Sequence, residues 1–342
     1  MLHPMNPLPP ATSGEVRVFA KLRDEALRLP YFLRYYRELG VDRFIMVDNA
    51  STDATVALLR GQPDVHLFHA AGSFAAAGGG QAWLDSLLDD FGEGHWCLTV
   101  DADELLVYPG SERHDLPAFC ASLSRQGAAG FACMLLDMYG GSDAQAYTPG
   151  EPFLAACPWF DPGPYWRAGP SGDCPAYEIY GGVRQRVFYP QWQAPSPTLR
   201  LSERLYDLGN RFAAVRDNVT IQSWRARRPP NLAKVPLVRW RAGLRYLACT
   251  HKITPIRLAA AEGCLLHFKF LADFRAKAAH EAARGEYFDG AREYRRYAEV
   301  LAEQPDVTLW YPDAARFRDS AQLQRLGLIG IMPQVAREIV DA

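Results

Sequence analysis

The stretch WCLTVDADELLVYPG, residues 96–110, places three carboxylates at the end of an apolar run. Its first half predicts a buried strand and its second half an exposed one. Between them stand Asp101, Asp103 and Glu104. Asp101 and Asp103 are two residues apart, so in an extended chain their side chains lie on the same side. Two such acids raise each other's pKa unless a cation compensates them, and the stretch therefore predicts a metal site.

The residues before this stretch alternate between strand and helix patterns. Strands are predicted over residues 15–22, 41–51, 64–70 and 95–101, and helices over 30–39, 53–60 and 81–91. Thr52 or Asp53 is expected to cap the second helix. Short connections between alternating elements indicate an α/β fold with a parallel, doubly wound sheet.

The pattern changes after residue 110. A helix near 115–126 and a strand over 131–140 precede an irregular, aromatic segment, 138–180, which is typical of a binding wall or a packed surface loop. Residues 225–245 are rich in arginine and lysine, and residues from about 270 predict two helices and a less regular tail. The proline-rich residues 1–14 are expected to be a disordered leader.

Composition excludes several classes of protein. A net charge of −2 gives no indication of nucleic-acid binding. Seven cysteines stand singly, without a CxxC pair, which argues against zinc and disulfide frameworks and favours a reducing, cytoplasmic compartment. No signal peptide and no apolar run of about 20 residues is evident.

The topology suggests where a ligand would bind. In open α/β sheets, ligands bind beyond the carboxyl ends of the strands. Asp48 ends the second predicted strand and Asp101 ends the fourth, so both should lie at one edge. Carboxylates with few other protein ligands suit Mg²⁺ or Mn²⁺ that also contacts phosphates. A solvated acidic turn is the alternative.

The chain resembles the family-2-like glycosyltransferases of GT-A fold. Four stretches carry the resemblance: AKLRDEALRLPYFLRYYRELGVDRFIMVDNASTDAT, WCLTVDADELLVY, YGGVRQRVF and LLHFKFLADF. It implies a Rossmann-related sheet flanked by helices, with residues 15–110 as the nucleotide-sugar half and 111–270 as the acceptor half. An irregular acceptor region and a mainly helical C-terminal extension, 271–342, would complete the chain.

The resemblance also implies a donor and metal site. Asp103 would bind Mn²⁺ or Mg²⁺ directly, Asp101 would approach the metal or the ribose, and Glu104 would orient them or face the acceptor. His267 would complete the metal site, with His251 beside Lys252 as a weaker candidate. The donor, a UDP-sugar, would contact the residues of the strand ends and two basic side chains: Lys21, Arg23, Glu25, Asp48, Asn49, Ser51, Arg184 and Lys269.

Catalysis by such an enzyme needs a base. In inverting enzymes of this fold the base usually follows the metal motif in the sequence, so the resemblance favours Glu178, with Asp137 and then Asp173 as competitors. A base of this kind implies inversion at the anomeric carbon. Aromatic rings that could stack on a saccharide or glycoconjugate acceptor are Tyr139, Trp159, Tyr165 and Trp166. The basic stretch 225–245 could meet an anionic acceptor or the inner face of a membrane, or be a solvated surface.

Two other functions remain open from the sequence. A nucleotidyltransferase would normally carry a glycine- and basic-rich loop after the first strand, which AKLRDEALRLP lacks. A non-catalytic carbohydrate- or nucleotide-binding protein would not need Asp101, Asp103 and His267. Gly78–Gly80, before the helix at 81–91, could approach a phosphate through the backbone or be a plain hinge.

Overall fold

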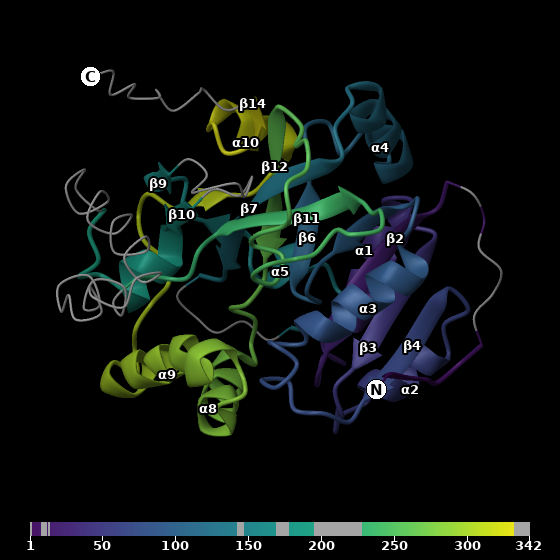
Figure 1. Cartoon of the computed structure of the whole chain (residues 1–342). Coiled ribbons are helices and arrows are strands. Elements are labelled where there is room, and N and C mark those ends of the chain that lie inside the picture. Colours follow the sequence, from purple (N-terminus) through teal and green to yellow (C-terminus); the bar gives the residue numbers. More distant parts are fainter. Residues whose placement is uncertain are drawn as a thin grey trace, which may run out of the picture.

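Four parallel strands form the first half of a large central sheet. The computed structural model describes residues 2–7, 12, 14–141, 147–168, 178–194 and 228–331. The four strands are β2 (Val16–Leu22), β3 (Arg43–Asp48), β4 (Val65–Ala70) and β5 (Trp96–Thr99), and they lie in the order β4-β3-β2-β5. The helices α1 (Leu29–Glu38), α2 (Thr55–Arg60) and α3 (Gln81–Phe91) connect them (Figure 1). The predicted alternation is therefore confirmed.

The second half of the sheet is mixed. β11 (Ala233–Arg239) lies antiparallel between β5 and β7 (Gly130–Tyr139). β12 (Ala261–His267) runs parallel to β7 and antiparallel to β6 (Glu104–Val107). The prediction of an exposed strand after the three acids is wrong, because pairing with β12 buries all of β6.

The remaining described elements are helices, short strands, and a separate two-stranded sheet formed by β9 and β10. They are β1 (Leu2–Pro4), α4 (Leu116–Arg125), α5 (Phe153–Ala156), β8 (Trp159–Phe160), β9 (Tyr165–Ala168), β10 (Glu178–Gly181), the π-helix η1 (Arg184–Phe188), α8 (Phe274–Arg284), α9 (Phe288–Glu303), β13 (Ala315–Arg316), α10 (Ser320–Arg325) and β14 (Gly330–Ile331). β1 pairs with β4, so the expectation of a disordered leader is wrong for Leu2–Pro4.

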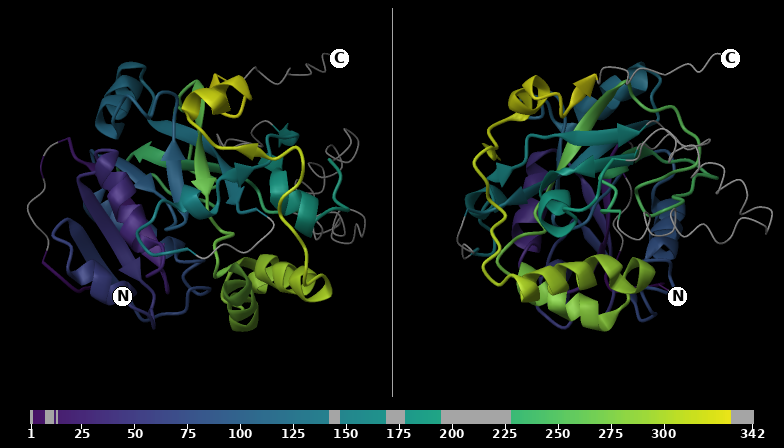
Figure 2. Two further views of the ribbon diagram at one scale, coloured as in Figure 1. Left: turned by 180° about the vertical axis from the view of Figure 1, so that it is seen from behind. Right: turned by 90° about the vertical axis from the view of Figure 1, so that its left-hand side faces the viewer.

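The C-terminal extension is helical first and returns to the sheet afterwards. α8 and α9 confirm the two helices predicted after residue 270. β13 pairs with β8, and β14 pairs with β12. In both views of Figure 2 the α8–α9 pair and α10 lie at opposite ends of the molecule. None of the described helices has the length and apolar character that crossing a membrane requires.

Alternate residues of the parallel strands serve two separate cores. Val18 of β2 packs in the core that contains Phe32 of α1, whereas Phe19 packs with Trp83 and Leu87 of α3. This follows from the two-residue period of a strand buried on both faces. Lys21 shares the face of Phe19, which brings it towards the start of α3.

Candidate metal and nucleotide site

The three acids lie in a tight turn between β5 and β6. The backbone N–H of Glu104 donates to the carbonyl of Asp101 at 3.0 Å, so residues 101–104 are not extended. Asp101 faces lysines from β2 and β11, whereas Asp103 faces His267 of β12. The expectation that the side chains of Asp101 and Asp103 point the same way is therefore wrong.

Lysine side chains compensate the charge of Asp101. Lys21 Nζ lies 3.2 Å from one of its oxygens and Lys234 Nζ lies 3.1 Å from the other. Lys234 also donates to Glu104, which is almost fully buried. Burial opposes ionisation of Asp101, but the two ammonium groups hold its pKa below the ordinary value. For Glu104 burial prevails and raises the pKa. Lys21 and Lys234 thus supply the positive charge next to Asp101 that the sequence analysis expected from a metal ion.

The start of α3 is shaped around Lys21. Gly80 has a φ of +75°, and a Cβ added to it would lie 2.8 Å from Cδ of Lys21. Glycine at this position therefore permits both the left-handed backbone and the close passage of the lysine. Packing against Lys21 is a third role for Gly80, besides the phosphate approach and the hinge predicted for Gly78–Gly80, which stay predictions.

Strand register aligns three polar side chains across β6, β12 and β7. His267 is paired with Glu104 on one side and with Asp137 on the other. Its Nδ1 lies 2.6 Å from Asp137 Oδ1, and its Nε2 lies 3.5 Å from Asp103 Oδ2. Burial opposes the imidazolium, but the two carboxylates raise the pKa of His267. Burial likewise opposes ionisation of Asp103, and His267 nevertheless holds its pKa well below the ordinary value.

The group fits a divalent cation. One ligand atom each from Asp103, Glu104 and His267 lies within 4.8 Å of the others. Two carboxylates and an imidazole are suitable ligands for Mn²⁺. A metal-ligating histidine usually donates its other ring N–H to a carboxylate, and Asp137 is in that position. Asp101, which was predicted as a ligand, is not in this group because its oxygens face the lysines.

Asp137 is held from two sides. One oxygen contacts His267, and the other accepts from Arg184 Nε at 2.7 Å. Burial opposes ionisation, but Arg184 and His267 lower the pKa of Asp137 to about 2. Because such a group binds a proton weakly at neutral pH, this environment favours positioning over the predicted role of base. Arg184 is buried in this ion pair, which contradicts its predicted exposure to a donor.

The predicted donor residues at the ends of β2 and β3 meet in one turn. Arg23 donates to the carbonyl of Asn49 at 2.8 Å. The buried carboxylate of Asp48 accepts from the backbone of Ser51, and the Ser51 hydroxyl accepts from the backbone of Asp24. The structure thus brings these residues together and shows how they stabilise the loops. Asp53 accepts from Thr55 N at 2.9 Å, but the N-cap of α2 is Ala54 and has no side-chain cap hydrogen bond, so the prediction of Thr52 or Asp53 as the cap is wrong.

α8 covers part of this edge. Lys277 of α8 pairs with Glu25 at 2.5 Å, and Asp273, just before α8, binds both terminal nitrogens of the buried Arg28 at 2.8 Å. Burial raises the pKa of Glu25, although Lys277 and Arg28 oppose that shift. Sequence reasoning missed these contacts because they join residues about 250 positions apart.

Other predicted residues lie near the group or away from it. Lys269 Nζ lies 3.4 Å from Glu293 and over the ring of Tyr294, so here it contacts α9. Glu178 lies on β10 and pairs with Arg228 at 3.5 Å. Asp173 lies outside the described residues. His251 bonds the carbonyl of Ala233 at 2.7 Å, and burial lowers its pKa to about 4.

The aromatic candidates divide by exposure. Tyr139 is fully buried and donates its hydroxyl to Asp161, so the prediction that its ring meets an acceptor is wrong. Tyr165 donates to the Asp161 carbonyl at 2.7 Å. Trp159 and Trp166 are partly exposed, and Trp166 stacks on Tyr180 with ring centres 5.6 Å apart. Tyr165 is also partly exposed, so Tyr139 is the one of the four rings that burial removes from the surface.

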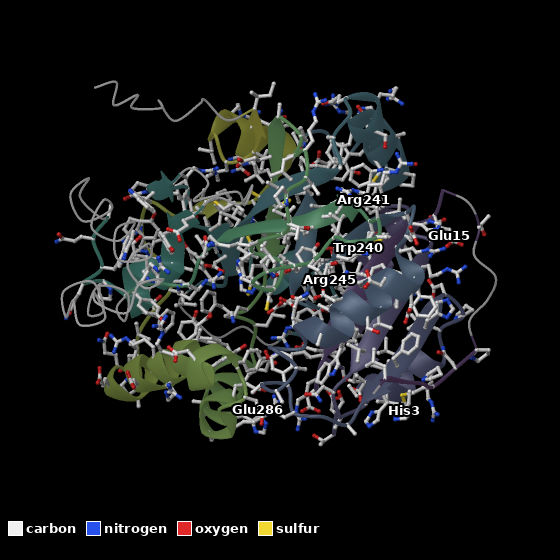
Figure 3. All side chains as sticks on the ribbon, in the orientation of Figure 1. His3, Glu15, Trp240, Arg241, Arg245 and Glu286 are labelled. Atoms are coloured by element: carbon white, nitrogen blue, oxygen red, sulfur yellow. The ribbon has the colours of Figure 1, made fainter. Side chains whose placement is uncertain are left out.

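The basic stretch does not form one surface. Residues 225–227 lie outside the described part of the chain, and Lys234 is buried under Asp101. Arg239 and Arg241 are exposed, and Arg245 pairs with Asp89 of α3 at 2.8 Å. Figure 3 shows Arg241 and Arg245 beside Trp240. Of the basic residues that the structure describes in this stretch, Lys234 is thus excluded from a surface patch, and contact of the stretch with an acceptor or a membrane stays a prediction.

Lys234 is the main site residue that the sequence interpretation missed. It was grouped with surface arginines, yet it interrupts the apolar run LAKVPLVRW. A lysine inside a strand that is otherwise apolar was the available signal, because such a residue needs a buried partner. Lys21, in VRVFAKL, shows the same pattern.

Comparisons with known proteins give little beyond this geometry. No family model and no curated protein matches the chain. A protein assigned as a glucose-1-phosphate thymidylyltransferase from Bacillus anthracis, with sucrose, is 12% identical over 38% of this chain and 57% of its own, with a TM-score of 0.25. The chain therefore spans little more than half of that structure.

Two further solved structures are similar over larger shares. HddC from Yersinia pseudotuberculosis is 13% identical over 40% of this chain and 70% of its own, with a TM-score of 0.25. A 4-diphosphocytidyl-2C-methyl-D-erythritol synthase is 15% identical over 56% and 85%, with a TM-score of 0.27. At TM-scores this low, the likeness carries no inference about what the chain does.

Proposed function

We propose that the chain is a metal-dependent glycosyltransferase, which moves a sugar from a UDP-sugar to a saccharide or glycoconjugate acceptor with inversion. One observation carries the proposal. Nε2 of His267 faces Asp103, and Glu104 lies beside them. Lys21 and Lys234 meet at Asp101, at the same edge of the sheet. A cation site and two ammonium groups at one edge of an α/β sheet suit a diphosphate.

Charge compensation is the main chemical task of this edge. A divalent ion held by Asp103, Glu104 and His267 would neutralise charge on the departing diphosphate. Lys21 and Lys234 already pair with Asp101, whose side chain is 41% exposed. We assign to these lysines the phosphate oxygens that approach from the open side of Asp101.

On the acceptor side, the reaction needs a general base and aromatic side chains that bind the acceptor sugar. Glu178 keeps the role of base in the proposal, since its side chain is partly exposed and it pairs only loosely with Arg228. It would take the proton of the attacking hydroxyl. Trp159 and Trp166 would hold the apolar face of the acceptor sugar.

A binding experiment tests the proposal first. We expect calorimetry to show UDP binding that strengthens with Mn²⁺, and we expect Asp103→Asn to remove that dependence. Asp90→Asn, at an exposed position of α3, is the matched control. UDP binding that is indifferent to Mn²⁺ would favour a non-catalytic binding protein instead.

A product assay distinguishes the two enzyme classes. With Mn²⁺ and a panel of UDP-sugars, a glycosyltransferase releases UDP, by slow transfer to water when no acceptor is present. A nucleotidyltransferase would release pyrophosphate from UTP and a sugar phosphate. Pyrophosphate release without UDP release would contradict the proposed function.

A further inference from the structure

A chain of four polar side chains runs from the candidate metal group into the C-terminal extension. His267 contacts Asp137 at 2.6 Å, and Asp137 accepts from Arg184 at 2.7 Å. Arg184 in turn lies 3.4 Å from Glu293. These residues come from β12, β7, η1 and α9, so the contacts join four separate elements in series.

The ring of His267 needs an orienting group. An imidazole can turn over and can carry its proton on either nitrogen, and the partner of one nitrogen decides what the other can do. Asp137 holds Nδ1, which leaves Nε2 facing Asp103. Arg184 Nη2 also lies 3.4 Å from Nδ1, so the guanidinium closes the remaining space on that side.

Asp137 itself needs a partner. It is almost fully buried, and a buried carboxylate without a compensating charge is costly. Arg184 supplies that charge and keeps one oxygen of Asp137 from turning away from the ring. Without Arg184, the carboxylate would keep His267 as a partner but would lose the guanidinium that neutralises it and fixes its second oxygen.

The backbone around Arg184 is unusual. η1 is a π-helix, a conformation that is rare and is often found at functional sites. Gly181, just before it, has a φ of +146°, and a Cβ there would lie 2.7 Å from Tyr165 Cδ1. The chain therefore turns sharply out of β10, and η1 directs Arg184 to Asp137 and Arg186 to Asp161.

Glu293 anchors the outer end of the chain. It lies on α9, contacts Arg184 and Lys269 at 3.4 Å each, and accepts from the Tyr297 hydroxyl. Burial opposes its ionisation, but Lys269 and Arg184 lower the pKa of Glu293 to about 2. The C-terminal helices are thus connected to the candidate metal group through one arginine.

We propose that Arg184 is a positioning residue, which fixes His267 through Asp137 so that Nε2 is presented to the metal, with Glu293 holding Arg184 from α9. The inference rests on the proposed metal-dependent function. It replaces the expectation that Arg184 contacts the donor, and it gives the helical extension a part in forming the site.

The test measures Mn²⁺ binding to the full chain without donor. Continuous-wave electron paramagnetic resonance gives the affinity, and pulsed resonance detects the ¹⁴N coupling of a bound imidazole. We expect Arg184→Met to weaken Mn²⁺ binding about 10- to 100-fold and to reduce the ¹⁴N coupling. Arg186→Met is the matched control, because Arg186 lies on the same π-helix and pairs with Asp161 instead. It should leave both readouts unchanged.

The outcomes separate this inference from the proposed function. Wild-type protein that binds Mn²⁺ with a ¹⁴N coupling, together with an Arg184→Met variant that does the same, would overturn the positioning role alone. Wild-type protein that binds no Mn²⁺ would overturn both. If Arg184→Met fails to fold, Glu293→Gln replaces it, because Glu293 is partly exposed. A smaller loss of affinity is then expected, and no loss would refute the inference.

Discussion

Replacing Lys234 by methionine should destabilise the protein strongly. The side chain is 6% exposed, and it neutralises Glu104, which is 1% exposed, as well as part of the charge of Asp101. Methionine fills a similar volume without the charge. Removing one partner of a buried ion pair costs about 3–5 kcal/mol, since the other charge is left uncompensated. Asp101 adds less to this figure, because it is more exposed and keeps Lys21.

Equilibrium unfolding in urea, followed by tryptophan fluorescence, measures the cost. We expect Lys234→Met to lower the free energy of unfolding by about 3–5 kcal/mol. The double variant Lys234→Met with Glu104→Gln should recover most of the loss, because no buried charge then remains in the pair. A single variant within about 1 kcal/mol of wild type, or a double variant whose loss equals the sum of the single losses, would refute the reasoning.

Three further outcomes are expected. Arg43 and Arg17 lower the pKa of Glu15 to about 2 against opposing burial (Figure 3). Its contribution to the free energy of unfolding should be present above pH 4.5 and lost as pH falls towards 2. A gap in unfolding free energy between wild type and Glu15→Gln that stayed constant over that range would contradict this. Gly80→Ala should weaken UDP binding, because the added methyl group would displace Lys21. Gly79→Ala is the control, since Gly79 has a similar φ but an added Cβ would meet no atom closer than 3.8 Å. Equal UDP affinities of the two variants would contradict the prediction. Removal of metal ions by a chelator should leave the circular dichroism spectrum unchanged, because lysines already compensate Asp101 and Glu104. Loss of secondary structure when the chelator is added would contradict this.

The first half of the fold could be predicted because its signals are local. The apolar period of residues 81–91 predicted the observed bounds of α3, and the alternation of strands and helices predicted that β2 to β5 are parallel, although not their order in the sheet. The position of His267 near the acids came from the family resemblance. Its orientation came only from the structure, in the register of β12 against β6 and β7.

The remainder depended on pairings that a single sequence does not reveal. Lys234 reaches Asp101 across 133 residues, because β11 inserts between β5 and β7. Without that pairing, the charge of Asp101 appeared to require a metal. Arg184 was assigned to the donor for a similar reason, since a π-helix that buries an arginine has no simple sequence pattern. Both errors concern which positively charged group neutralises a given acidic side chain.

The most direct test of the account is the location of Mn²⁺ in a crystal of the protein soaked with Mn²⁺ and UDP. Anomalous scattering identifies the ion. The account predicts one Mn²⁺ coordinated by Asp103, Glu104 and Nε2 of His267, with the diphosphate of UDP completing its ligands. Mn²⁺ bound elsewhere, or UDP bound with Asp103 and His267 still facing each other and no ion between them, would contradict it.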